Sequence, residues 1–343
     1  MTAGLLRRSF VGMLVAAGVR AQAPVFESET RVVEVGIVAR DSDGNPVADL
    51  TKQDFHVFDN GVEQTIQSFD KMWDPPRAAN GLPTGLPPYR PTVIVWNMLG
   101  GSVTGQPAIK DAIAEMLWNL PQTVDRIKIL ALGDELKTVH GFTPMRLALR
   151  TAILEFSWQP GPVADPTLWA IKNLHYIAQD LKQIRGEKGL IWVGGFSLHA
   201  PDGGSMGGGG AARGGGFSIT KGPPASGGGV SGHDRDYFQD MADAMRALSD
   251  AQVMFYPVAP SMVKPFELDD FARMTGGQAY WEDKQLPDLI RGAIDDSRDA
   301  YVLTYVPSNY KRDGPDHEVK LKIDRSHVDL NYREGYTVDP PSK

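Results

Sequence analysis

The end of one apolar segment shows what chemistry this chain can support. Residues 92–96 read as a buried strand, followed by Asn97 and, a few residues later, by Ser102 and Thr104. In an open α/β sheet, ligands bind outside the carboxyl ends of the strands, so these side chains are expected to face a partner. A hard divalent cation needs carboxylate oxygens, and general acid–base catalysis needs a titratable group. An amide and two hydroxyls supply neither, so this loop indicates a surface that binds and does not catalyse.

A second segment that could carry chemistry surrounds Ser197. It reads Gly195-Phe196-Ser197-Leu198-His199 and resembles the Gly-x-Ser-x-Gly turn on which α/β-hydrolases hold their nucleophile, except that His199 replaces the last glycine. That turn also requires a helix directly after the serine, whereas this chain continues into a glycine-rich tract. We therefore predict no catalytic residue and no enzyme activity, and a serine hydrolase that uses Ser197 stays an alternative.

Histidines near the glycine-rich tract raise the question of zinc. His199 and His233 bracket the tract, and Asp234 and Asp236 follow it. Spacing of this length specifies no ligand geometry, so solvated histidines are the expected state. The sequence predicts no metal ion and no cofactor.

The elements that position these loops alternate between strands and helices. Apolar runs predict strands at 92–96, 126–132, 189–193 and 253–258. Helical spacing of apolar residues predicts helices at 108–120, 147–156, 168–184, 236–251 and 267–274. This order predicts an α/β domain over 92–299 with a doubly wound, mostly parallel sheet. A flexible glycine-rich insertion is expected at 200–233.

The segments on either side of this domain are predicted to be β structure. The first, 22–73, contains an alternating run at 31–40 and a hairpin around Asn60-Gly61. The last, 300–338, contains strand patterns at 300–306, 317–323 and 328–336. Neither segment has enough strands to be stable alone, so we expect the two to pair into one small β domain into which the α/β domain is inserted. A proline-rich linker is predicted at 74–91.

The amino-terminal residues predict export. Arg7 and Arg8 precede an apolar run at 10–19 and then small residues, which is the layout of a secretory signal peptide, here residues 1–21. The run is too short to span a membrane, and no later apolar stretch is long enough, so the mature chain is predicted to lie outside the cytoplasm, periplasmic or secreted, without membrane insertion. Sec and twin-arginine export both stay open.

Charge and composition narrow the range of partners. The chain has 343 residues, no cysteine and a formal net charge of -7, and loss of residues 1–21 removes three arginines and no acid. A surface this acidic repels phosphate backbones, so nucleic acid is excluded as a partner.

Motifs at both ends of the chain resemble those of a known family. They are Val35 to Asp41 with Gly44-Asn45-Pro46-Val47, Leu50 to Phe55 and Phe58-Asp59-Asn60-Gly61 near the start, and Ala272 to Gly277, Asp299 to Pro307 and Tyr332 to Tyr336 near the end. In this order they resemble exported bacterial proteins called VWFA-related (acidobacterial) domain proteins, over about residues 25–338. The resemblance implies a von Willebrand factor A-type fold. In other proteins that fold binds partners through a metal held by an Asp-x-Ser-x-Ser loop, a threonine and a further aspartate.

This chain departs from that metal site. The matching positions hold Asn97, Leu99 and Gly101 in the loop, Asp165 and Thr167 where the threonine is expected, and Gly194-Gly195 at the later aspartate. A hard cation that keeps at most one carboxylate binds weakly. The resemblance therefore implies a binding fold with a degenerate metal site.

The expected function is that of an exported, non-enzymatic protein-binding, adhesion or assembly module. Its protein partner would engage the loops beyond Trp96, Leu132 and Val193. The candidate residues of this rim are Asn97, Ser102, Thr104, Asp134, Asp165 and Thr167. Alanine at Asn97 and Asp165 is expected to weaken capture of the partner without lowering thermal stability. A structural component of the cell envelope is the alternative.

Overall fold

The computed structural model describes residues 32–71, 91–99, 105–120, 126–195, 237–259, 266–281, 285–298, 301–308 and 317–336. Several expectations lie outside these residues: the signal peptide at 1–21, most of the linker at 74–91, Ser102, Thr104, Ser197, His199, the tract at 200–233 and His233. Within the described ranges, no helix combines the length and apolarity that a membrane span requires.

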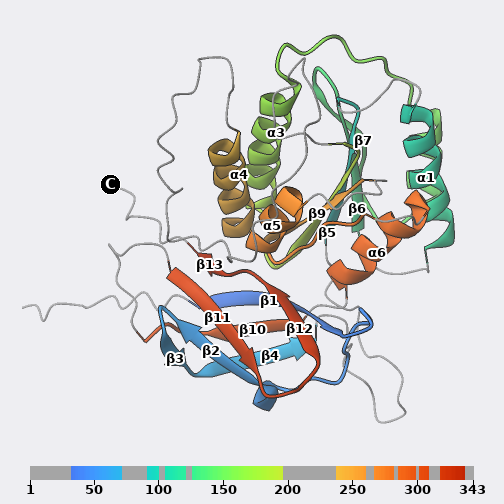
Figure 1. Ribbon diagram of the computed structural model, residues 1–343. Coiled ribbons are helices and arrows are strands. Elements are labelled where there is room, and N and C mark those ends of the chain that lie inside the picture. Colours follow the sequence, from blue (N-terminus) through green and yellow to red (C-terminus); the bar gives the residue numbers. More distant parts are fainter. Residues whose placement is uncertain are drawn as a thin grey trace, which may run out of the picture. The chain divides into compact units, whose positions relative to one another are not determined.

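A five-stranded sheet forms the centre of the α/β domain (Figure 1). Its order is β7-β6-β5-β8-β9, with β5 at Pro91–Asn97, β6 at Arg126–Leu132, β7 at Leu136–Thr143, β8 at Lys188–Val193 and β9 at Val253–Val258. All neighbouring strands are parallel except β7, which runs antiparallel to β6 at one edge. The order reverses next to β5, the first strand of this sheet along the chain, as in doubly wound folds. The predicted doubly wound, mostly parallel sheet is confirmed.

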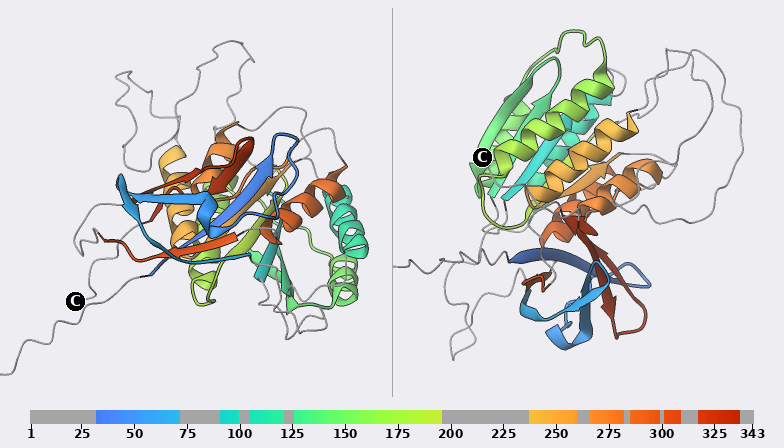
Figure 2. Two further views of the ribbon diagram at one scale, coloured as in Figure 1. Left: turned by 90° about the horizontal axis from the view of Figure 1, so that it is seen from below. Right: turned by 90° about the vertical axis from the view of Figure 1, so that its left-hand side faces the viewer.

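Helices cover both faces of this sheet. The first group, α1 at Gln106–Asn119, α2 at Arg146–Glu155 and α6 at Leu286–Arg298, packs on the face that carries Ile94 and Trp96. The second group, α3 at Pro166–Leu181, α4 at Phe238–Asp250 and α5 at Phe266–Met274, packs on the face that carries Val93 and Val95. Figure 2 shows α3, in green, and α4, in yellow-orange, side by side. Because β5 is buried on both faces, its sequence is a continuous apolar run.

The β domain is a sandwich of two four-stranded antiparallel sheets. The first sheet has the order β12-β1-β10-β4, with β1 at Val33–Asp41, β4 at Ile66–Lys71, β10 at Tyr301–Tyr305 and β12 at Val328–Tyr332. The second has the order β13-β11-β2-β3, with β2 at Phe55–Asp59, β3 at Val62–Gln64, β11 at His317–Ile323 and β13 at Gly335–Tyr336. A short 3-10 helix, η1 at Lys52–Asp54, precedes β2.

Both sheets of the sandwich mix strands from the two ends of the chain. Strand β1 pairs with β10 and β12, and β2 pairs with β11. The shared core contains Ile37, Val57 and Leu303, each fully buried. The α/β domain is thus inserted into a β domain made of the amino- and carboxyl-terminal segments, as the fold prediction states. The predicted hairpin turn is present as well, with positive φ angles at Asn60 (48°) and Gly61 (78°).

Candidate functional site

Asn97, the last residue of β5, lies at the edge of the sheet where β5, β6, β8 and β9 end, here called the carboxyl edge. Its side chain is only 2% exposed. The amide nitrogen donates a hydrogen bond to the carbonyl oxygen of Gly195 at 2.7 Å, and the amide oxygen accepts one from the backbone N–H of Leu99 at 3.1 Å. The two polar atoms of Asn97 therefore tie the end of β5 to its own loop and to the end of β8.

Gly194 explains why these two strand ends can come so close. Its φ angle is 126°, which L side chains rarely adopt, and a Cβ atom there would lie 2.7 Å from the carbonyl oxygen of Asn97. Its N–H donates to the carbonyl oxygen of Val258 at 3.0 Å, so β9 is joined to the same place. Only glycine fits this position, where the resemblance would put a metal-binding aspartate.

Asp165 starts helix α3 as its N-cap. One carboxylate oxygen accepts a hydrogen bond from the N–H of Leu168 at 2.9 Å, and Pro166 follows in the first turn, where it is favoured. The other oxygen accepts a hydrogen bond from the hydroxyl of Tyr237 at 3.1 Å, directly before α4. Asp165 thus joins the beginnings of two helices. Thr167 lies half-buried in the same first turn.

Asp134 is the exposed member of the candidate set. It follows β6, and its carboxylate lies against Gly161, where a Cβ atom would come within 2.9 Å of the aspartate oxygen. The neighbouring Gly133 accepts a hydrogen bond from the indole N–H of Trp169 at 2.8 Å. The loop after β6 is therefore fixed against the α2–α3 connection and against α3.

Aromatic side chains beside this edge were not among the candidate residues of the rim. The rings of Trp96, Phe156 and Trp158 form a row of edge-to-face contacts, with both centroid separations at 6.2 Å. The ammonium group of Lys137 lies 4.1 Å from the centroid of the half-buried Trp158 ring. The available signal was the position of Trp158 in the connection between two predicted helices, where its ring packs only partly against the core.

The residues described do not fit the metal site that the resemblance implies. Both polar atoms of Asn97 are bonded to main-chain groups, both oxygens of Asp165 accept hydrogen bonds, and Gly194 has no side chain. Across the described parts of the chain, no group of three or more His, Cys, Asp or Glu residues gathers at one place. Within the described part of the chain, no hydrogen bond joins Asn97, Asp134 and Asp165 to one another. Asn97 and Asp165 instead fix two separate segments, the loop after β5 and the start of α3.

Comparisons with known proteins give only structural similarities at low sequence identity. No protein-family model matches the chain, and no curated protein sequence matches it. Among solved structures, it is similar to an aerotolerance-related membrane protein from Bacteroides fragilis, with 9% identity and a TM-score of 0.37 over 61% of this chain and 98% of that one. It is also similar to the SpRpn10 VWA domain, with 11% identity and a TM-score of 0.35 over 59% of this chain and 94% of that one.

A further similar structure is proximal thread matrix protein 1 from the mussel byssus, with 11% identity and a TM-score of 0.38. The match covers 61% of this chain and 48% of that one, so the chain matches about half the length of the mussel protein. The likenesses assign no residue roles. The strand order of the sheet, with helices on both faces, establishes the α/β fold of this chain.

Proposed function

We propose that this protein is an exported, non-enzymatic module that binds a protein partner through the carboxyl edge without a metal ion. The observation that supports this most is that Asn97 uses both polar atoms of its amide within the carboxyl edge and leaves neither for a metal ion. Its amide is buried and bonded on both sides, where a metal-binding relative would present a carboxylate. A partner would therefore contact a rigid surface. The groups that this surface offers include exposed Asp134 and the Lys137–Trp158 pair.

Rigidity supports a binding role for this surface. Hydrogen bonds that Asn97 and Trp169 donate and Asp165 accepts hold the loops that follow β5, follow β6 and begin α3. Binding through loops that are already ordered avoids the entropy loss of ordering them, which is typically about 0.5–1.5 kcal/mol for each flexible side chain. Tryptophan and charged groups on such a surface are common sources of binding energy.

Alanine variants of exposed Asp134 and half-buried Trp158, tested in the presence of chelator and checked for folding by thermal melts, test the proposal. The mature chain, immobilised, is used to capture partners from a cell-envelope extract of its own host, with EDTA present. Asp134→Ala and Trp158→Ala are expected to reduce capture at least about fivefold, because loss of a central contact typically weakens binding by 1 kcal/mol or more. The control is Tyr176→Ala on α3, since Tyr176 is 57% exposed and absent from the rim.

Two results would contradict the proposal. Capture that depends on added magnesium, calcium or manganese would restore a metal-dependent mechanism. Capture by Asp134→Ala and Trp158→Ala that equals capture by Tyr176→Ala would move the binding surface elsewhere. Asn97→Ala is unsuitable for this test: removal of a buried amide that makes two hydrogen bonds lowers stability by about 1 kcal/mol for each bond. The expectation that this substitution leaves stability unchanged is therefore revised.

A further inference from the structure

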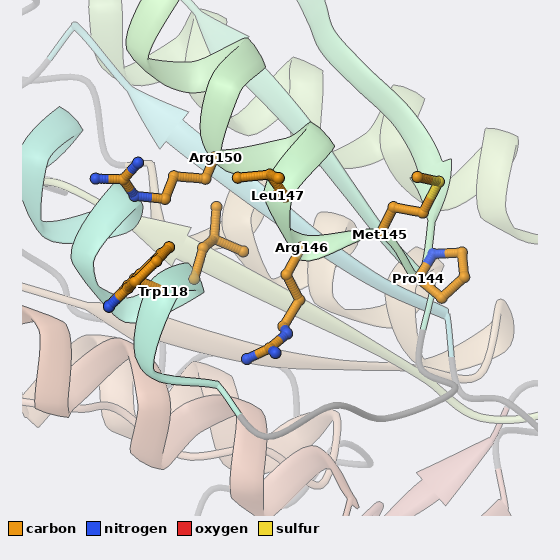
Figure 3. Close-up of a pocket in the computed structure, with 7 residues that line it drawn as sticks. Trp118, Pro144, Met145, Arg146, Leu147 and Arg150 are labelled. Carbon is orange, nitrogen blue, oxygen red and sulfur yellow. The ribbon is translucent and has the colours of Figure 1, made fainter.

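A hollow with a volume of about 480 Å³ lies between the last turn of α1 and the first turn of α2, here called the α1–α2 pocket (Figure 3). Figure 3 shows Arg146 and Arg150 extending from α2 and Trp118 facing them from α1. The volume falls within the range of pockets that hold small ligands or single large side chains, about 300–1,000 Å³.

The pocket carries an unusual amount of exposed apolar surface. Trp118, Met145 and Leu147, which all line it, are each 65% exposed. Single exposed apolar residues are ordinary, but several that gather around one hollow mark an interaction site. The walls of the pocket are therefore suited to an apolar side chain from outside.

Two arginines in the pocket have no acidic partner among the residues that the structure describes. Arg146 and Arg150 are four residues apart on α2, and like charges at this spacing destabilise a helix by about 0.2–0.5 kcal/mol. Within the described residues, no ion pair or hydrogen bond joins either guanidinium group to an acid. The Arg150 guanidinium lies 5.2 Å from the centroid of the Trp118 ring, and its Nε is buried without a hydrogen-bond partner. In a chain with a net charge of -7, these two arginines form a locally positive site that favours an anionic group.

The start of α2 adds to this positive potential. The helix has no side-chain N-cap hydrogen bond and no acidic residue in its first turn. The free N–H groups and the helix dipole at this end favour a negative charge. The two arginines and the helix end thus make a consistent electrostatic environment beside the apolar walls.

This pocket is separate from the carboxyl edge. Helix α1 begins after the carboxyl end of β5 and ends at Asn119, before β6 begins, so its last turn lies toward the opposite edge of the sheet. Antiparallel β7 also runs from the carboxyl edge to that opposite edge, where Thr143 leads into Pro144 and Met145. A ligand bound in this pocket would therefore not touch the carboxyl edge.

We propose that the α1–α2 pocket binds an acidic peptide segment of a partner protein. An aromatic or large aliphatic side chain of the peptide enters the pocket against Trp118 and Leu147, and a neighbouring carboxylate pairs with Arg146 and Arg150. The planar guanidinium group matches a carboxylate with two parallel hydrogen bonds, which gives such a site its preference for acids. The concave shape favours a side chain over a lipid surface, because membrane-binding faces lie flat in the interface.

Fluorescence anisotropy with a defined peptide tests the proposal. The probe is a short labelled peptide of alternating glutamate and phenylalanine, titrated with the purified mature chain at low salt. Saturable binding is expected, and the double variant R146Q/R150Q and the single variant Trp118→Ala are each expected to weaken it at least about tenfold. Arg291→Gln on α6 and Tyr176→Ala on α3 are the matched controls, and both are expected to bind as the unchanged chain does.

Further arms separate the peptide from other ligands. A peptide with glutamine in place of glutamate is expected to bind at least about tenfold more weakly, since it lacks the charge that Arg146 and Arg150 recognise. Equal binding of the two peptides, or an unchanged affinity in R146Q/R150Q, would overturn the proposal. Binding to phosphatidylglycerol vesicles without binding to the peptide would assign the surface to lipid instead. Thermal melts of each variant establish that a loss of binding is not a loss of folding.

Discussion

At the scale of single residues, the most constrained carboxylate is Asp59 at the end of β2. It is fully buried, accepts hydrogen bonds from the hydroxyls of Tyr305 at 2.9 Å and Tyr336 at 2.8 Å, and lies 2.5 Å from Nδ1 of His317. Burial raises the pKa of the Tyr305 phenol above its ordinary range, and the nearby Asp59 charge adds to this, so the hydroxyl stays a donor. Partners from β10, β11 and β13 thus satisfy a group that would otherwise strongly destabilise the core.

His56, also on β2, makes the stability of the β domain depend on pH. Its Nδ1 lies 2.8 Å from Glu63 and its Nε2 lies 3.2 Å from Asp324. Hydrogen bonds to Glu63 and then to Asp324 raise the pKa of His56 above its ordinary value of 6.5. Because the folded-state pKa is the higher one, the protonated imidazole stabilises the fold fully below about pH 6.5, and this contribution disappears as the pH rises through the raised pKa.

Melting temperatures of the unchanged chain and of His56→Gln, measured across this pH range at low salt, check the expectation. The gap between them is expected to be largest near about pH 5.5 and to close by about pH 9. The effect is small because the side chains of the three residues are 43%, 59% and 68% exposed. A gap that stays constant with pH would show that the ion pairs do not contribute.

At the scale of the elements, Gly194 controls how closely the ends of β5 and β8 approach. Gly194→Ala places a Cβ atom 2.7 Å from the Asn97 carbonyl at a φ of 126°, whereas Gly44→Ala meets no atom within 4 Å at a φ of 81°. Backbone strain of this kind typically costs about 1–3 kcal/mol, and Gly194→Ala adds a clash. We expect Gly194→Ala to lower the free energy of unfolding by at least about 1 kcal/mol more than Gly44→Ala. Urea denaturation of both variants measures this, and equal losses would remove the role given to Gly194.

The elements that the sequence predicts well are those with a strong apolar period. Strand β5 and helices α1 and α3 are buried over a whole run or along one face, so their pattern is visible in one dimension. Strand β7 is absent from the sequence prediction. It lies at the edge of the sheet and is partly exposed throughout, so its residues show no alternation between apolar and polar.

The candidate site divides in the same way. Its position at the carboxyl edge follows from strand order, which the sequence predicts. Its hydrogen bonds could not be predicted from the sequence. Asn97 bonds to Gly195 and Asp165 bonds to Tyr237, residues far apart in the chain that only the folded sheet brings together. The α1–α2 pocket could not be predicted from the sequence either, because Trp118 and Arg150 come together only when the two helices pack.

At the scale of the whole molecule, Arg333 joins the β domain to the α/β domain. It is 9% exposed, and its two terminal nitrogens donate to the carbonyl oxygen of Ser249 at 2.9 Å and to that of Glu34 at 2.6 Å. Arg40 of β1 forms an ion pair with Asp296 of α6, which is 2% exposed. Buried charge-assisted bonds of this kind contribute more than surface pairs, about 1.5–3 kcal/mol for a hydrogen bond to a charged group.

Replacing Arg333 tests how much this junction contributes. Arg333→Met is expected to lower the free energy of unfolding by about 2 kcal/mol, since two buried carbonyl groups lose their charged donor. Arg325→Met is the matched control, because Arg325 pairs with the exposed Asp49 inside the β domain and such a pair contributes under about 1 kcal/mol. Denaturant unfolding measures both. If the two variants lose the same stability, the two domains are not held together by Arg333.

The insertion of one domain in another also sets an order of events during synthesis. Strands β1 to β4 leave the ribosome before the α/β domain, yet the strands that pair with β1 in the described part of the chain, β10 and β12, are made after it. The hairpin of β2 and β3 can close at once, because its partners are neighbours in the chain. The newborn chain must therefore carry β1 with open edges while more than half of the protein is still being made. Such edges invite pairing with other chains, so a cell that produces this protein is expected to protect its amino-terminal strands until the last ones arrive.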